Sequence, residues 1–163
     1  KKAVFKKKEL DLNEMVENIA KSFTLRVEHT GGKIYTEIEA IDSAIFVDEM
    51  HFQNVIFNLM DNAVKYRKQD KPIDIYLRTW NDNDHLYLSV RDTGLGIKKE
   101  NLKKIFDKFY RVHTGNVHDA KGFGLGLAYV HKVVDLHDGE IKVESEYGKG
   151  TTFTIKLPVI KDE

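Results

Sequence analysis

The chain has 163 residues, which is enough for one domain with a continuous core. Its 26 basic and 26 acidic residues cancel and neither sign forms a long block, so charge gives no reason to expect binding to nucleic acid or to a membrane surface. The absence of cysteine excludes disulfides and thiolate metal sites. Because the first residue is Lys1, we expect residues 1–163 to be a single domain taken from a longer protein.

Hydrophobic spacing predicts helices over residues 12–23, with Asp11 as the cap, about 48–68, and about 125–136. Alternation predicts a hairpin with strands over 24–30 and 33–40 around Gly31-Gly32, and further strands over 44–47, 73–80, 85–91, 140–146 and 151–157. Helices mixed with mostly antiparallel strands indicate an α+β fold. The expected architecture is a two-layer α/β sandwich in which the helices cover one sheet face.

The long helix carries three asparagines opposite its apolar stripe. Asn54, Asn58 and Asn62 are spaced four residues apart, and Lys65 and Tyr66 follow about one turn later. A solvated face explains one asparagine, but such a face normally uses Glu, Lys or Gln, because asparagine costs roughly 0.5 kcal/mol relative to alanine inside a helix. Amide oxygens are hard ligands that suit Mg²⁺. The row therefore favours a magnesium site beside phosphate, with Lys65 as a point charge.

Asp92 ends a strand whose other inward residues are apolar. Alternation puts it on the same face as Leu88 and Val90, so its carboxylate points into the core. A buried carboxylate is costly unless a donor meets it, and an exocyclic amine such as that of adenine would supply one. Gly94 and Gly96 follow and allow a close backbone approach. The alternative is a carboxylate that caps its own turn through the next two amides.

Asp92-Thr93-Gly94 also matches the aspartic-protease triplet. Those enzymes need two such carboxylates in an almost all-β chain. This chain has one triplet and three expected helices. A dimer would supply a second aspartate, but the helices still argue against a protease.

A second glycine run, Gly122-Phe123-Gly124-Leu125-Gly126-Leu127, opens the last expected helix. It lacks the G-x-G-x-x-G spacing, and residues 117–121 before it do not read as a strand, so a Rossmann site is not expected. Backbone amides at a helix N-terminus, free of side chains, form a good phosphate cradle. Residues 112–121 are polar and weakly patterned, as expected of a mobile lid over such a cradle.

Five motifs together resemble the catalytic domain of sensor histidine kinases. Residues 58–66 (NLMDNAVKY) resemble the N box of that family, and residues 92–96 (DTGLG) resemble its first glycine box. Residues 106–111 (FDKFYR) resemble the F box, 122–127 (GFGLGL) the second glycine box, and 148–153 (GKGTTF) the last one. The resemblance implies the Bergerat ATP-binding fold, which gyrase B, mismatch-repair ATPases and heat-shock-90 chaperones share.

The resemblance also implies a role for each matching residue. Asn62 would be the principal Mg²⁺ ligand, and Asn58, Lys65 and Arg111 would be catalytic, with Arg111 meeting the charge that develops on the γ-phosphate. Asp92 would accept from the adenine amine. The full set expected to contact the nucleotide is Asn58, Asn62, Lys65, Tyr66, Asp92, Gly94, Gly96, Ile97, Tyr110, Arg111, Lys121, Gly122, Gly124, Leu125, Gly126, Leu127 and, through water, Thr151.

The function that the resemblance implies is transfer of the ATP γ-phosphoryl group to a histidine on a separate dimerisation domain. Two alternatives stay open: a nucleotide-binding module without catalysis, and a protein-serine kinase of the same superfamily. The presence of Asn62, Lys65 and Arg111 favours the enzyme, and the F box argues against the serine kinase. Asn58 stands where related ATPases carry a glutamate that activates water, which favours transfer over free hydrolysis. Phe123 departs from the family, which usually has a small residue there.

The family's acceptor histidine lies in a string like His-Glu-x-Arg-x-Pro. None of the seven histidines of this chain is followed by glutamate, so the isolated chain is not expected to phosphorylate itself. The expected cofactors are ATP and Mg²⁺. The expected partners are the protein's own dimerisation domain and a response regulator, within a homodimeric protein. We expect a cytoplasmic domain that contacts neither membrane nor nucleic acid, in a protein that is anchored to a membrane.

Overall fold

The computed structural model describes residues 4–107 and 126–160. Its helices are α1 (Leu12–His29), α2 (Glu49–Lys65), α3 (Lys99–Leu102) and α4 (Leu127–Leu136). Its strands are β1 (Lys7–Asp11), β2 (Ile34–Ile38), β3 (Ala44–Asp48), β4 (Ile75–Asn81), β5 (His85–Asp92), β6 (Glu140–Glu146) and β7 (Gly150–Pro158). The predicted site residues Tyr110, Arg111, Lys121, Gly122, Gly124 and Leu125 lie outside the described residues.

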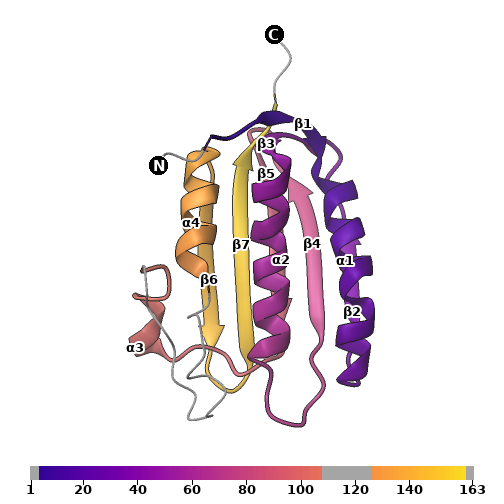
Figure 1. Ribbon diagram of the computed structural model, residues 1–163, viewed down its shortest axis with the longest axis vertical. Coiled ribbons are helices and arrows are strands. Elements are labelled where there is room, and N and C mark those ends of the chain that lie inside the picture. The colour runs from indigo at the N-terminus through magenta and orange to yellow at the C-terminus, as the bar shows by residue number, and fades with distance from the viewer. Residues whose placement is uncertain (1–3, 108–125, 161–163) are drawn as a thin grey trace.

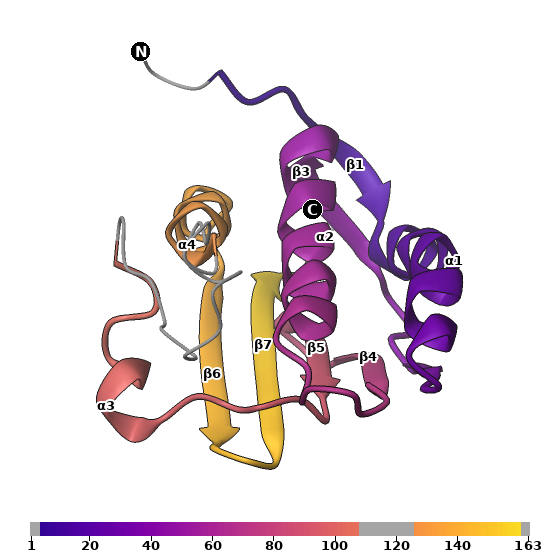
Figure 2. The ribbon, with the colours of Figure 1, turned by 60° about the horizontal axis from the view of Figure 1, so that its bottom comes forward.

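Five strands form one sheet in the order β2-β4-β5-β7-β6, and β1 pairs with β3 in a separate two-stranded sheet. The β2–β4 pair is parallel and the other pairs are antiparallel. The long helices α1, α2 and α4 lie together on one face of the five-stranded sheet, with α2 in the middle (Figures 1 and 2). These arrangements confirm the predicted α+β sandwich with a mixed, mostly antiparallel sheet.

The core lies between α2 and the sheet. The apolar stripe of α2 is buried as its spacing predicts, and it consists of Phe52, Val55, Ile56, Leu59, Met60, Ala63 and Val64. Each large side chain of this kind contributes about 1.5–3 kcal/mol when it leaves water. At the N-terminus of α2 the Asp48 carboxylate accepts from the His51 N–H at 3.0 Å, a cap worth about 1 kcal/mol. The helix that carries the asparagine row is therefore held firmly along its other face.

The strand predicted over residues 24–30 is wrong, because α1 continues to His29. Phe23 and Val27 are buried and extend the helical spacing of Val16 and Ala20, so packing overrides the preference of Thr24 and Val27 for strands. The hairpin built on that strand is wrong as well. Gly31 has φ +92° and donates to Glu28 O at 2.9 Å, so it ends the helix instead of turning a hairpin.

Two further differences from the prediction concern the edges of the fold. The residues after the glycine pair form β2, which pairs in parallel with β4 because the chain returns along the sheet after a helix. Strand β1 carries the charged run Lys7-Lys8-Glu9, which gives no strand pattern, and it forms only because β3 offers a partner. The remaining elements lie within about three residues of their predicted ends.

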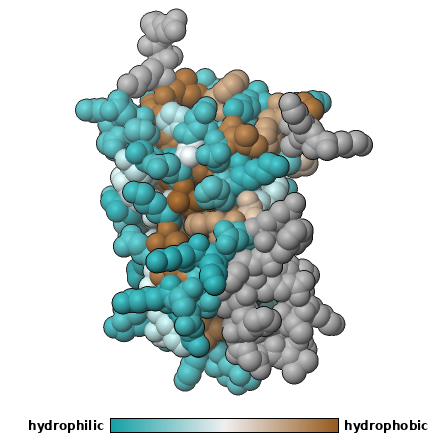
Figure 3. Space-filling view, turned by 90° about the vertical axis from the view of Figure 1, so that its left-hand side faces the viewer, coloured by the Kyte–Doolittle hydropathy of each residue, from teal (hydrophilic) through white to brown (hydrophobic). Residues whose placement is uncertain are grey.

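The side of the molecule that carries α4 is mainly hydrophilic, with a narrow band of hydrophobic side chains (Figure 3). Among the described residues, no helix has the length and apolar character required to cross a membrane.

Candidate functional site

Asp92 lies at the end of β5, in register with Thr151 at the start of β7. Its Oδ1 accepts from the Gly94 N–H at 2.9 Å, so it does cap its own turn. Burial nevertheless raises the pKa of the carboxyl to about 6, against the opposing hydrogen bonds from the backbone N–H groups of Gly94 and Thr151. A ligand that donates a further hydrogen bond to this carboxylate would therefore stabilise its charged form.

The segment after Asp92 runs directly against the C-terminal end of α2. A Cβ at Gly94 would lie 2.9 Å from the carbonyl oxygen of Tyr66, so only glycine fits without movement. The same Tyr66 oxygen accepts from the Leu95 N–H at 3.0 Å. The end of the N-box helix and the first glycine segment, which are distant in sequence, are therefore joined by backbone contacts.

The turn between β6 and β7 closes on the same segment. Gly96 has φ +75°, and a Cβ there would lie 2.2 Å from the Glu146 carbonyl oxygen. The Gly148 N–H donates to Leu95 O at 2.6 Å. Ile97, which is almost fully buried, follows and packs in the core. The first and last glycine boxes thus contact each other through their backbones and together form one wall of the candidate site.

Ser145, which the sequence reasoning did not single out, lies within this wall. Its Oγ accepts from the Ile97 N–H at 2.7 Å and is 2.8 Å from the hydroxyl oxygen of Thr151. Thr151 is buried, on the same strand face as Phe153. The signal for Ser145 was available: it follows Ile141 and Val143 at the spacing of the half-buried face of β6, which makes it a polar residue on that face.

The asparagine face of α2 lies opposite the start of α4. Asn58 and Asn62 are half-buried, whereas Asn54 is exposed. A Cβ at Gly126, the N-cap of α4, would lie 3.9 Å from Asn58 Oδ1, and Gly126 has φ +67°. Leu127 has its side chain in the core, so only its backbone can face a ligand. The N-terminus of α4 and the amide side chain of Asn58 therefore lie next to each other.

Lys65 is held at the end of the asparagine row by an ion pair. Its Nζ lies 2.8 Å from Asp61 Oδ2, and Arg26 from α1 reaches Asp61 Oδ1, also at 2.8 Å. Burial alone would raise the pKa of Asp61, but hydrogen bonds from the two cations outweigh it and lower that pKa. The ion pair with Asp61 therefore orients the half-exposed Lys65 side chain along the helix surface.

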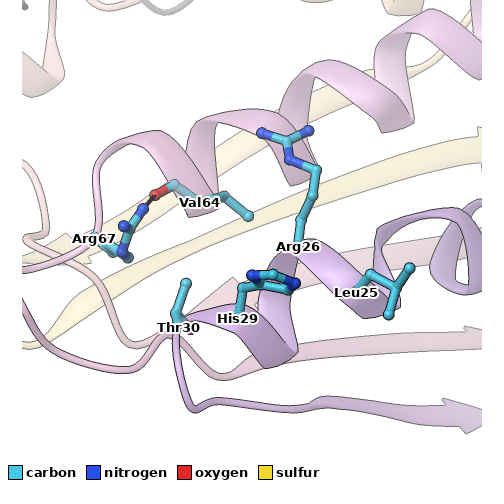
Figure 4. A pocket seen from close by; sticks show the side chains of 6 residues that line it. All are labelled: Leu25, Arg26, His29, Thr30, Val64 and Arg67. Carbon is cyan, nitrogen blue, oxygen red and sulfur yellow. Dashed lines mark hydrogen bonds between the residues drawn. The ribbon is translucent and has the colours of Figure 1, made fainter.

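One hollow, of about 370 Å³, lies at the strand ends of this site. It is lined by Asp92, Ser145, Gly150 and Thr151, together with Arg91, Thr93, Glu144, Glu146, Lys149 and Thr152. Arg91, Glu144 and Thr152 alternate with core residues, so their side of the hollow lies on the sheet face without helices. Another hollow, of about 350 Å³, lies between the C-terminal ends of α1 and α2, where Arg67 Nη1 donates to Val64 O (Figure 4).

The residues present fit a nucleotide and a hard cation. Asp92 and Thr151 offer oxygen atoms at one end of the sheet, and Asn58 and Asn62 offer amide oxygens beside a helix N-terminus. Within residues 4–107 and 126–160 no cluster of three or more His, Cys, Asp or Glu side chains is arranged to hold a metal. Among the described residues, the side-chain groups beside the α4 N-terminus that suit a hard cation are the amide oxygens of Asn58 and Asn62.

Residues 47–161, more than half of the chain, match the family described as histidine kinase-, DNA gyrase B-, and HSP90-like ATPases. The sensor protein RprX of Bacteroides fragilis is 57% identical over 162 residues, which cover 99% of this chain and 31% of RprX. The sensor histidine kinase RcsC of Escherichia coli is 35% identical over 153 residues, covering 93% of this chain and 16% of RcsC. The chain thus spans a third or less of the length of these relatives.

Solved structures share the fold. The catalytic domain of the histidine kinase ThkA has a TM-score of 0.82 at 24% identity, covering 95% of this chain and 99% of that domain. Full-length ShkA in complex with AMPPNP gives 0.81 at 23% identity, over 98% of this chain and 32% of ShkA. ThkA in complex with the response regulator protein TrrA gives 0.76 at 22% identity, over 94% and 42%. The chain belongs to the family of histidine kinase-, DNA gyrase B- and HSP90-like ATPases, as a catalytic ATP-binding domain of the sensor histidine kinase type.

Proposed function

We propose that this domain binds Mg·ATP and transfers the γ-phosphoryl group to a histidine on a separate dimerisation domain, for relay to a response regulator. One observation carries the proposal: the N-terminus of α4 lies beside Asn58 of α2, while the Asp92 strand end meets the end of the same helix through Gly94 and Tyr66. The proposal assigns a phosphate-binding end and a base-binding end to the two parts of the site that meet this helix.

The base-binding end follows from the polarity of Asp92 and its surroundings. A carboxyl whose pKa burial raises to about 6 gains most from a ligand that donates a hydrogen bond to the ionised form. The 6-amino group of adenine is such a donor. The glycines at 94 and 96 leave no side chain between this carboxyl and an incoming ring, since neither position accepts a Cβ. We therefore assign Asp92 to adenine and the Thr151 hydroxyl to the edge of the ring.

The phosphate-binding end combines three kinds of group. The amides at the start of α4 suit phosphate oxygens, Asn62 and Asn58 suit Mg²⁺, and Lys65, which is paired with Asp61, adds a positive charge. When bound, Mg²⁺ would neutralise phosphate charge and orient the terminal group for transfer. Arg111, predicted from the F box, would supply the cation that meets the charge of the transition state.

Transfer is favoured over hydrolysis by the chemistry of Asn58. An amide cannot take a proton from water, so this position lacks a general base. We therefore infer that the nucleophile comes from another domain and is positioned in line with the γ-phosphate. The whole-protein part of the proposal rests on the relatives: RprX and RcsC are named as sensors, and ThkA was solved with a response regulator. We further propose that this domain lies in the cytoplasm and belongs to a homodimeric, membrane-anchored protein.

Binding of ATP and of inorganic pyrophosphate tests the proposal on the chain itself. Calorimetry in the presence of Mg²⁺ should give saturable ATP binding, and Asp92→Asn should weaken ATP at least about tenfold while leaving pyrophosphate nearly unchanged. Asp135→Asn, on the exposed surface of α4, is the matched control and should alter neither. Equal ATP affinity in the Asp92 variant and the unmodified chain would remove the adenine assignment.

A further inference from the structure

The hydroxyl of Ser145 connects three segments that build the proposed base-binding end. Its Oγ accepts from the Ile97 N–H at 2.7 Å, donates to Gly150 O at 2.9 Å, and lies 2.8 Å from Thr151 Oγ1. Ile97 belongs to the segment after β5, whereas Gly150 and Thr151 begin β7. One small side chain therefore ties together the first glycine segment, the last glycine turn and the buried threonine.

Strand register places this hydroxyl two strands away from Asp92, with Thr151 on the strand between them. Thr151 pairs with Asp92 on one side and with Ser145 on the other. The three residues form a single row across β5, β7 and β6, and the next row along the same face is Val90, Phe153 and Val143. The polar row thus lies directly beyond the last apolar layer of the core, at the strand ends where the base is expected.

The donor and acceptor capacities of these groups show how Ser145 holds the Thr151 hydroxyl in place. The Ile97 N–H can only donate and the Gly150 carbonyl can only accept, whereas the Ser145 and Thr151 hydroxyls can do both. The Ser145 proton has two acceptors in reach, Gly150 O and Thr151 Oγ1. When the Ser145 hydroxyl donates to Gly150 O, the Thr151 hydroxyl donates to Ser145 Oγ, and the Thr151 lone pairs can accept from a ligand. When the Ser145 hydroxyl donates to Thr151 Oγ1, the Thr151 proton can be donated to a ligand or to water. Both arrangements hold Thr151 Oγ1 at one place.

We propose that Ser145 is a positioning residue for nucleobase recognition, which it serves by fixing the Thr151 hydroxyl beside Asp92. The inference rests on the proposed nucleotide function and adds a residue to it. Ser145 acts through Thr151, because its own hydrogen bonds are to protein groups that form the wall of the site. It also lets the Thr151 hydroxyl switch between donor and acceptor without moving, so that this hydroxyl can match the base or a bridging water.

The test is a double-mutant cycle on nucleotide affinity, measured with the 163-residue chain. Kd values for ATP, for purine riboside triphosphate, which lacks the 6-amino group, and for pyrophosphate are compared among the unmodified chain, Ser145→Ala, Thr151→Val and the double variant. Ser145→Ala should weaken ATP about five- to tenfold, reduce the preference for ATP over the purine analogue, and leave pyrophosphate unchanged. In the Thr151→Val background Ser145→Ala should have almost no further effect on ATP.

A matched pair covers the case in which Ser145→Ala does not fold. Ser145→Thr keeps the hydroxyl and Ser145→Val replaces it with a methyl group of the same shape, so the pair differs in the hydroxyl alone. The threonine variant should bind ATP within about twofold of the unmodified chain, and the valine variant should reproduce the alanine result. Thermal unfolding of each variant checks that the comparison is between folded proteins.

The outcomes separate the inference from the function on which it rests. If the costs of Ser145→Ala and Thr151→Val simply add, or if pyrophosphate weakens in parallel with ATP, Ser145 is a structural brace and the inference is wrong, although ATP binding stands. If the unmodified chain binds pyrophosphate but shows no preference for ATP, the proposed function fails and this inference fails with it.

Discussion

The Gly94 backbone N–H donates a 2.9 Å hydrogen bond to Asp92 Oδ1, and partial burial raises the pKa of the same carboxyl to about 6. The carboxyl of Asp92 is therefore both tied into its turn and poorly stabilised as an ion. In the absence of nucleotide its charge opposes folding at neutral pH, which is the behaviour expected of a binding group that is completed by its ligand.

Asp92→Asn should stabilise the nucleotide-free domain. In the unfolded chain the carboxyl ionises near its ordinary value of 3.8, and in the folded chain only near 6. Its contribution to stability is therefore full below pH 3.8 and is lost as the pH rises through about 6. The loss is at most about 3 kcal/mol. Thermal unfolding at pH 8 should give the variant a Tm several degrees higher, and the gap should narrow toward pH 4. An unchanged or lower Tm at pH 8 would mean that burial does not destabilise this charge.

Asn62→Ala should separate metal binding from base binding. Loss of the amide ligand should remove the enhancement of ATP affinity by Mg²⁺, on the order of tenfold or more, and leave adenosine binding nearly intact. Asn54→Ala is the control, because Asn54 is the same residue type on the same helix face but is exposed. ATP titrations with Mg²⁺ and with EDTA make the comparison. If EDTA weakens ATP as much in the Asn62 variant as in the unmodified chain, Asn62 is not the ligand.

Gly96→Ala and Gly148→Ala compare a close approach with backbone strain alone. Both glycines have positive φ, +75° and +90°, but a Cβ at 96 would lie 2.2 Å from Glu146 O, whereas nothing lies within 4 Å of one at 148. Gly148→Ala should cost about 1–2 kcal/mol of unfolding free energy, and Gly96→Ala at least about 3 kcal/mol, together with weaker ATP binding. Urea unfolding measures both. Equal costs would show that the wall moves apart freely.

His137 should make stability fall in mild acid. It is buried, its Nε2 accepts from the Asp48 N–H at 3.0 Å, and its Nδ1 lies 2.7 Å from Val133 O, which defines a neutral ring with the proton on Nδ1. Burial lowers its pKa, helped by Lys7 and His51, against the Val133 hydrogen bond and the charge of Asp48. Its contribution is therefore present above the unfolded value of 6.5 and is lost as the pH falls through the lowered folded pKa.

His137→Leu tests this assignment. The variant should lose roughly 1–3 kcal/mol at pH 7.5, because the Asp48 N–H is left without its acceptor, and its unfolding free energy should decline less steeply between pH 7 and pH 5. His29→Leu, on the exposed end of α1, should change neither quantity. A His137 variant whose pH profile runs parallel to that of the unmodified chain would show that another group is responsible.

Sequence patterns predicted the elements that carry their own periodicity and missed those that depend on a partner. Helix α2 and strands β4 to β7 follow from apolar spacing that matches their buried faces. Residues 24–30 were misread because Thr24 and Val27 prefer strands locally, although Val27 is buried as part of α1. Strand β1 has no such pattern and exists through its pairing with β3.

The site residues also divide into those that a pattern within one element predicts and those that depend on contacts between segments. Alternation along β5 predicted the inward direction of Asp92, and helical spacing predicted the asparagine row, because both depend on one element. The contact between Gly94 and Tyr66, the approach of Gly126 to Asn58 and the hydrogen bonds of Ser145 each join segments distant in sequence. No local pattern contains that information. The roles of Arg111 and Lys121 remain predictions from motif resemblance, since both lie outside the described residues.

Phosphoryl transfer in trans tests whether this domain phosphorylates a histidine on another domain. The chain is incubated with Mg²⁺ and γ-³²P-labelled ATP, alone and with the dimerisation hairpin of a related sensor kinase, and labelled protein is treated with acid and with base. The hairpin should acquire acid-labile label, the chain alone should acquire none, and Arg111→Ala should reduce transfer by about a hundredfold or more. Acid-labile label on the chain alone, or acid-stable label on the hairpin, would contradict transfer to a histidine on a separate domain.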